Sequence, residues 1–155
     1  MPPNGGMEPP TTPFLARDSG VPEPVLRSWL SAGLVRRPFR GVYVPAGLDD
    51  SIDLRAACAA LLLPPHSVLV ERSAAWMHGI DLHSPDERHT VPALEVARLR
   101  GHGPLRRDGI YGGTRDLAPR DVTQLGDVRL TTPLRTALDL GCLAGEVQAL
   151  TALDS

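Results

Sequence analysis

Residues 20–44 read GVPEPVLRSWLSAGLVRRPFRGVYV, and this stretch carries the clearest structural pattern of the chain. Apolar residues recur at helical spacing between Glu23 and Ala32, which predicts a helix with one face turned to the core. Gly33 is placed to end this helix, because glycine readily takes the left-handed backbone conformation at a helix C-terminus. Two β-rich runs then flank Pro-Phe-Arg-Gly at 38–41, a pattern typical of a β-hairpin. The stretch therefore predicts a helix followed by a hairpin.

A shorter helix is expected just before this stretch. The threonines that precede Pro13 can cap it, Pro13 suits its first position, and Gly20 ends it. Short helix, turn, longer helix and basic hairpin is the order of a winged helix-turn-helix, which we expect over residues 11–47. Residues 1–10 are rich in proline and glycine and have little to bury, so they predict a disordered leader.

Polar residues of this region are the candidate DNA contacts. The outer face of the longer helix could read the major groove of a duplex. Guanidinium groups in the hairpin could grip phosphates or enter a minor groove. The alternatives are an ordinary polar helix face and a solvated basic turn. The candidates are Arg27, Ser28 and Ser31 on the helix and Arg36, Arg37 and Arg40 in the hairpin.

Residues 48–155 predict a mixed domain in which helices flank a mostly antiparallel sheet, so the chain is assigned to the α+β class. Its helices follow from apolar spacing, and its strands from short β-rich runs punctuated by glycine and proline. A last apolar segment, Val147 to Leu153, also has helical spacing. The other expected elements are helices at 49–63 and 71–78, strands at 68–70, 88–91, 96–99, 110–111, 121–124 and 128–131, and a helix from Pro133 through Leu140.

The charged residues limit the chemistry that the chain can perform. The formal net charge is −2, and all 16 basic residues are arginines. Without lysine there is no Schiff base, no Walker-type phosphate contact and no nuclease centre that pairs acidic residues with a lysine. Arginine still recognises phosphate or guanine through its bidentate fork, so nucleic-acid binding depends on where the arginines gather.

No catalytic, metal or cofactor site is expected, which favours a binding protein over an enzyme. The acidic residues and histidines between 78 and 89 do not share one helix face, and no nucleophile is spaced for a base and its orienting partner. Cys58 and Cys142 lie far apart in apolar stretches, which favours buried free thiols. The chain has no apolar run near the roughly 20 residues of a membrane helix and no signal peptide at its start, so we expect a cytoplasmic protein.

Four segments stand out as a set. They are GV, WL, GL and RGVY within 20–43, SVLVERSAAWMHG at 67–79, HTVP at 89–92, and DV at 121–122 with LTTPLRTALDL at 130–140. In this order they resemble the winged-helix and following domains of AbiEi-family antitoxins and their actinobacterial relatives, over about residues 11–142. The resemblance places an AbiEi-like α+β domain at 48–155. The family usually has one more helix before the helix-turn-helix, where this chain has its leader.

The resemblance implies a bacterial transcriptional regulator of a type IV toxin–antitoxin operon. Such antitoxins bind inverted repeats near their promoter, so the implied partners are double-stranded operator DNA and a cognate toxin, with no membrane. Two alternatives stay open. The chain could be the targeting region of a longer protein with a Vsr-like nuclease domain after Ser155, or a protein-interaction module whose degenerate helix-turn-helix no longer binds DNA.

A second basic region lies in the loop-rich part of the chain after residue 96. It could form a further phosphate-contacting surface or a toxin-binding face, and the alternative is a dispersed set of solvated loops. Arg135 and Asp139 stand four residues apart in the last helix, which predicts an ion pair. The candidates for the second basic surface are Arg98, Arg100, Arg106, Arg107 and Arg115.

Overall fold

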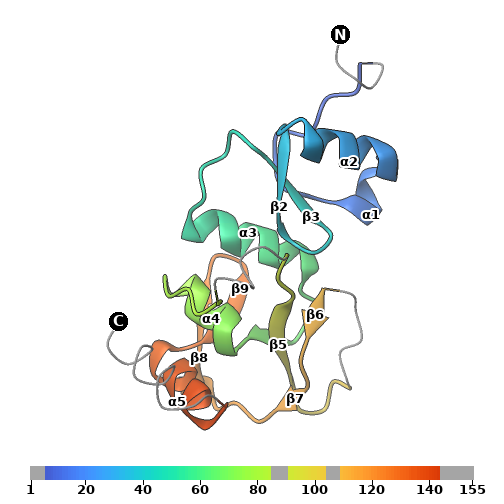
Figure 1. The fold of residues 1–155 in the computed structure, drawn as a ribbon. Helices are drawn as coiled ribbons and strands as arrows, with labels where there is room; N and C mark the ends of the chain where they lie inside the picture. Colours follow the sequence, from blue (N-terminus) through green and yellow to red (C-terminus); the bar gives the residue numbers. More distant parts are fainter. Residues whose placement is uncertain (1–5, 85–90, 104–108, 144–155) are drawn as a thin grey trace.

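The computed structural model describes residues 6–84, 91–103 and 109–143. A small three-stranded sheet carrying two helices lies at one end, and a six-stranded sheet with further helices forms the rest (Figure 1). Helix α3 (Ile52–Leu62) lies between the two sheets. The architecture is a mixed α+β fold, as expected.

The first unit is built from two short helices and three strands in the order β-α-α-β-β. Strand β1 pairs antiparallel with β3, and β3 pairs antiparallel with β2, so β3 is central. Residues 14–15 were expected in a helix but form β1, because Phe14 pairs with Tyr43 of β3 and their rings stack at 5.7 Å. The elements are β1 (Phe14–Leu15), α1 (Ala16–Ser19), α2 (Glu23–Ser31), β2 (Val35–Phe39) and β3 (Val42–Pro45).

Helix α2 confirms the helix predicted between Glu23 and Ala32 and ends one residue earlier, at Ser31. Pro22 stands at its N-cap, and Leu26 and Trp29 are buried on its inner face. They form a small core cluster with Val35 and Tyr43 of the sheet. Gly33 follows the helix with a φ of 71°, the left-handed conformation that its position required.

The hairpin of β2 and β3 turns at Arg40 and Gly41, as predicted. Its register shifts between Arg36, which pairs with Val44, and Phe39, which pairs with Val42. This bulge accommodates the proline at position 38, which has no N–H to give to the ladder. As a result, Phe39 and Val42 face α3 and enter the main core.

Helix α3 connects the two sheets through one continuous core. Ser51 caps it by accepting a hydrogen bond from the Leu54 N–H at 3.0 Å. Its small buried residues Ala56, Cys58 and Ala59 allow close packing. The main core cluster contains residues of β2 and β3 as well as residues of the larger sheet. The expected division after residue 47 therefore separates two sheets that share this core.

The larger sheet is mixed in direction. Its strand order is β6-β5-β4-β9-β8, and β7 also pairs with β5. The β4–β5 and β8–β9 ladders are antiparallel, as expected, but β4–β9, β5–β6 and β5–β7 are parallel. The strands are β4 (Ser67–Leu69), β5 (Leu94–Leu99), β6 (Ile110–Tyr111), β7 (Thr114–Arg115), β8 (Val122–Leu125) and β9 (Val128–Thr131).

Helices α4 (Glu71–Met77) and α5 (Pro133–Leu143) pack against each other, and the 3₁₀ turn η2 (Pro119–Asp121) precedes β8. Between β6 and β7, the backbone passes so close to β5 that position 112 must be a glycine. A Cβ atom at Gly112 would stand 1.6 Å from the carbonyl oxygen of Val96 in β5. The expected strand at 88–91 and the expected helix at 147–153 lie wholly or almost wholly outside the described residues.

Candidate nucleic-acid interface

The outer face of α2 presents the polar residues that were predicted to contact DNA. Arg27 is 73% exposed in its side chain, and its guanidinium lies 3.4 Å from the carboxylate of the exposed Glu23 one turn earlier. Ser31 is exposed and Ser28 is half-buried. Because Leu26 and Trp29 point into the small core, these polar groups lie on the opposite side of the helix and face solvent.

Arg37 lies on the same side of the small sheet as α2. Its guanidinium stands over the ring of Tyr43, 5.7 Å from the centroid, and Tyr43 belongs to the core cluster beneath α2. The ring face attracts the cation and orients it. The Nε atom of Arg37 is buried and has no hydrogen-bond partner among the described residues. Arg37 therefore adds a positive charge on the side of the small sheet where α2 lies.

Arg36, in contrast, makes a hydrogen bond within the protein. Its Nη2 atom donates a 2.8 Å hydrogen bond to the carbonyl oxygen of Leu48, in the segment that leads into α3. Its charge also contributes to the lowered pKa of Asp50, after the larger effect of the hydrogen bond from Arg55. Arg36 and Arg37 thus act on opposite faces of the same strand.

The tip of the hairpin is turned toward the larger sheet. A Cβ atom on Gly109 would lie 3.1 Å from the carbonyl oxygen of Arg40, so the two backbones are close. The Phe39 ring meets the Trp76 ring of α4 edge to face, with centroids 5.4 Å apart. Figure 1 shows the turn between β2 and β3 directed toward β5 and β6. The turn that was expected to project as a basic wing is therefore in contact with the rest of the protein.

The second basic surface is divided among separate ion pairs. Arg100 pairs with Asp116 at 2.5 Å, and both side chains are exposed. Arg115 is half-buried and donates to Glu71 and Asp139. Arg98 is half-buried, and Arg106 and Arg107 lie outside the described residues. Within the described part of the chain, the arginines expected to form this surface do not gather on one free patch.

Arg115 belongs to an ionic chain that sequence reasoning found only in part. The predicted pair is confirmed: Arg135 Nε donates to Asp139 Oδ1 at 2.9 Å. Arg135 also donates to Asp121 Oδ2 at 3.2 Å. The chain therefore runs from Glu71 through Arg115, Asp139 and Arg135 to Asp121 and links α4, β7, α5 and η2. The i,i+4 spacing revealed one pair, but nothing local signalled the other links.

Two histidines of the stretch considered for a metal site have other partners, and His89 lies outside the described residues. His78 Nε2 lies 2.8 Å from the Thr131 carbonyl oxygen, and His83 Nδ1 lies 2.9 Å from Asp81 Oδ1. Among the described residues, no group of three or more metal-binding side chains is found. Cys58 is fully buried, and desolvation raises the pKa of its thiol to about 11. Cys58 is therefore a core packing residue of α3.

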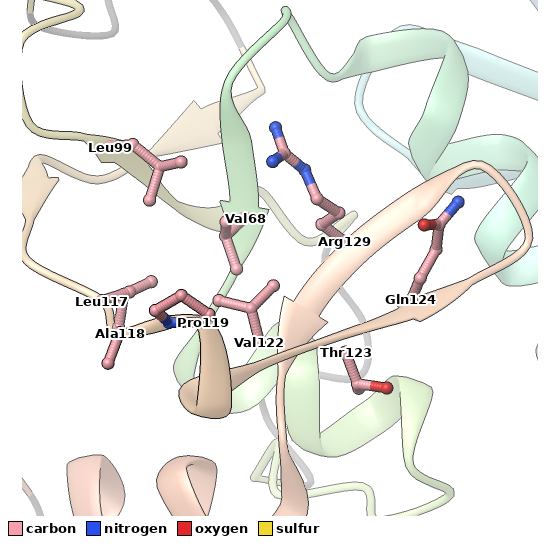
Figure 2. Close-up of a pocket in the computed structure, with 9 residues that line it drawn as sticks. All are labelled: Val68, Leu99, Leu117, Ala118, Pro119, Val122, Thr123, Gln124 and Arg129. Atoms are coloured by element: carbon pink, nitrogen blue, oxygen red, sulfur yellow. The ribbon is translucent and has the colours of Figure 1, made fainter.

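A pocket of about 380 Å³ opens on the face of the larger sheet opposite the α3 core. Figure 2 shows Val68 and Val122 at its centre, with Leu99 and Leu117 on one side and Arg129 and Gln124 on the other. Among the described residues that line it, none is Asp, Glu, His or Cys, so no side-chain base stands in this pocket to activate the hydroxyl of Thr123.

These observations define an α+β protein with an exposed polar helix face on its small sheet and a larger mixed sheet whose partly buried arginine Arg115 is paired with carboxylates. A family model described as the AbiEi antitoxin C-terminal domain matches residues 66–155, and the chain belongs to this family. The match begins just before β4. No curated protein matches the chain. None of the described helices is long and apolar enough to cross a membrane.

Proposed function

We propose that the protein is a DNA-binding transcriptional regulator that represses its own operon as an AbiEi-type antitoxin, acts in the cytoplasm and performs no catalysis. The observation that carries this proposal is the outer face of α2, where Arg27 is exposed above a buried apolar face and Arg37 extends the same side. Membership of the antitoxin family supports a role in a toxin–antitoxin system.

The arrangement of the first unit supports a winged helix-turn-helix that lacks the usual first helix. Two helices, α1 and α2, are joined by a tight turn at Gly20, and α2 is followed by the hairpin. An α-helix with its side chains is about 10–12 Å in diameter, and the major groove of B-DNA is about 12 Å wide. Helix α2 can therefore lie in that groove with Arg27, Ser28 and Ser31 toward the bases.

The three arginines of the hairpin have different surroundings and are given different roles. Arg37 is the one placed to reach a phosphate beside α2, because it lies on the α2 side of the sheet. Arg36 holds the segment before α3, and the Arg40 turn lies against Gly109. We therefore assign DNA contact to α2 and Arg37, and we give Arg36 and Arg40 the role of holding the unit in place.

The test compares binding of the purified chain to a duplex from its own promoter and to a scrambled duplex, over a range of salt concentrations. An Arg27→Ala/Arg37→Ala variant should bind the promoter at least about tenfold more weakly, and the salt slope should fall by about one for each phosphate contact removed. Arg100→Ala removes a positive charge elsewhere on the surface and serves as the matched control. A promoter reporter should lose repression with the double variant alone.

Four results would contradict the proposal or a part of it. Equal binding to promoter and scrambled DNA would remove sequence-specific regulation, and an unchanged affinity of the folded double variant would remove α2 from the interface. The absence of DNA binding would favour the protein-interaction module instead. Cleavage of plasmid DNA by the chain in magnesium or manganese would contradict the non-catalytic part of the proposal.

A further inference from the structure

The face of the larger sheet that is turned away from α3 carries an apolar hollow. Leu69 belongs to the main core on the α3 side, so the alternation of side chains along β4 turns Val68 to the opposite face. There Val68 forms a small cluster with Ala97, and Leu99 and Val122 pack against it. The pocket of about 380 Å³ opens over this cluster. The hollow therefore follows from the apolar pattern of the strands themselves.

Arg129 brings one positive charge to this apolar face. Its neighbours in β9, Val128 and Leu130, both enter the main core, so alternation turns Arg129 toward the pocket. The pairing of Leu69 with Leu130 places Val68 and Arg129 side by side on that face. Arg129 is half-buried and has no ion pair among the described residues. No carboxylate stands among the described residues that line the pocket, so its positive charge is available to a ligand.

The polar and apolar groups of the pocket lie on different sides. Gln124 is the cross-strand partner of Arg129, and its Nε2 atom donates to the Gly126 carbonyl oxygen at 2.8 Å. Figure 2 shows these two polar side chains on one side and Leu99 and Leu117 on the other. Small-molecule sites commonly combine an apolar lining with a few polar groups that fix the orientation of the ligand. A complementary ligand has an apolar body and a negatively charged head.

The size and charge of the pocket narrow the class of ligand. A cavity of about 150 Å³ holds one benzene molecule, so this pocket has room for a ring with a short chain. A guanidinium binds a carboxylate through two parallel hydrogen bonds. The single charge of Arg129 balances a monoanion, whereas a phosphate dianion would keep an uncompensated charge beside apolar side chains.

We propose that this pocket binds a small monocarboxylate with an aromatic or branched apolar body. The carboxylate lies at the guanidinium of Arg129, and the apolar body lies over Val68 and Val122 toward Leu117. The site is built from β4, β5, β8, β9 and the segment before β8, and it uses no residue of the α2 face. It is therefore a binding activity separate from the DNA contact proposed above.

Amide NMR spectra of the full chain give the first test, with hydrocinnamate as the probe. The signals of Val68, Val122 and Arg129 should shift on titration, with a Kd of about 1 mM or below for a ligand of this size. Hydrocinnamamide has the same shape without the charge and should bind at least about fivefold more weakly. Acetate has the charge without the apolar body and should leave these signals in place at the same concentration.

Variants of the full chain give the second test. Arg129→Gln should weaken hydrocinnamate binding to the level of hydrocinnamamide and leave the affinity for hydrocinnamamide unchanged. Arg17→Gln is the matched control, because it removes the same charge from an exposed arginine of α1 and should leave both affinities unchanged. Val122→Phe fills the centre of the pocket and should abolish binding, while slow hydrogen exchange of the α3 amides shows that the fold is intact.

The pattern of binding decides the outcome. Shifts confined to the pocket, together with loss of the charge preference in Arg129→Gln, support the proposal. Three results would overturn it: no shift with hydrocinnamate, equal affinity of the wild type for the acid and its amide, or unchanged binding by the folded Val122→Phe variant. Shifts centred on the exposed leucines of α5, Leu134 and Leu138, would also overturn it, because they would show non-specific adsorption to apolar surface.

Discussion

The ring of Phe39 meets the ring of Trp76 edge to face, with 5.4 Å between their centroids. Phe39 ends strand β2 of the small sheet, and Trp76 belongs to α4 of the larger unit. This contact lies beside α3 and joins the main core across both sheets. The orientation of α2 relative to the larger sheet therefore depends on packed aromatic side chains as well as on the chain connection.

Removing the Phe39 ring should destabilise the whole protein. Phe39 is 1% exposed, and a buried phenylalanine replaced by alanine costs about 3–5 kcal/mol. In chemical denaturation, Phe39→Ala should lower the stability by that amount and keep a single transition, because both sheets share one core. Leu34→Ala, at an exposed position, should change stability by less than about 0.5 kcal/mol. Two separate transitions in the wild-type protein would contradict the shared core.

The glycine between β6 and β7 offers a sharp comparison with its neighbour. An alanine at Gly112 would place its Cβ 1.6 Å from the Val96 carbonyl oxygen, whereas a Cβ at Gly113 meets nothing within 4 Å. Gly112→Ala should therefore cost about 3 kcal/mol or more through strain in β5, and Gly113→Ala should stay within about 1 kcal/mol of the wild type. Equal thermal midpoints for the two variants would show that this connection does not approach β5 so closely.

Two arginine–aspartate pairs should differ in their contribution to stability. Arg115 is partly buried and joins Glu71 to Asp139, whereas Arg100 and Asp116 are both exposed. Arg115→Met leaves the partly buried Glu71 without its donor and removes one of the two donors of Asp139, and it should cost about 2 kcal/mol. Arg100→Met should cost less than about 1 kcal/mol, because solvent screens the pair. Urea unfolding of both variants measures the difference, and equal losses would contradict the role given to the ionic chain.

The contribution of Asp50 to stability should disappear in acid. Arg55 donates to both Asp50 oxygens, at 3.0 and 2.7 Å, and this hydrogen bonding holds the pKa of Asp50 below its ordinary value of 3.8. The charged form is thus favoured in the folded state. Stability from this source is present above the ordinary pKa and is lost as the pH falls through the lowered folded-state pKa.

Unfolding experiments at pH 7 and at successively lower pH can follow this loss. The stability difference between the wild type and Asp50→Asn should be largest at pH 7 and should shrink as the pH falls below about 4. The neighbouring exposed Asp49→Asn is the control and should give a difference that is smaller at pH 7. A gap between wild type and Asp50→Asn that grows in acid would have the wrong sign for this ion pair.

Elements whose structure depends on residues close together in the sequence could be predicted from the sequence. Helix α2 and the hairpin after it follow from apolar spacing, Gly33 and Gly41, and strand β9 has the predicted bounds, Val128–Thr131. Strand β1 could not be predicted in the same way. Phe14 and Leu15 follow a helix-start pattern, but their pairing with β3, some 28 residues away, replaces the expected helical turn. Likewise, strand-like runs do not reveal that β4 and β9 run parallel.

The candidate site was predicted as a set of residues but not as a geometry. Arg36 and Arg37 are adjacent in sequence, yet alternation along the strand sends them to opposite faces. The inward direction of the Arg40 turn depends on Gly109 and on the Phe39–Trp76 contact, which involve residues far along the chain. Arg115 was expected on a basic surface because its partner Glu71 is 44 residues away and gives no local signal.

The position of α3 also determines which changes the protein can accept over evolutionary time. A helix with one buried face can exchange its outward residues freely, but α3 has neighbours in both sheets. Larger side chains at Ala56, Cys58 or Ala59 would force two sheets apart at once. A library of random variants should therefore be depleted of large residues at these three positions more strongly than at the exposed Ala57 between them, and an inserted residue in mid-helix should remove function from both ends of the molecule.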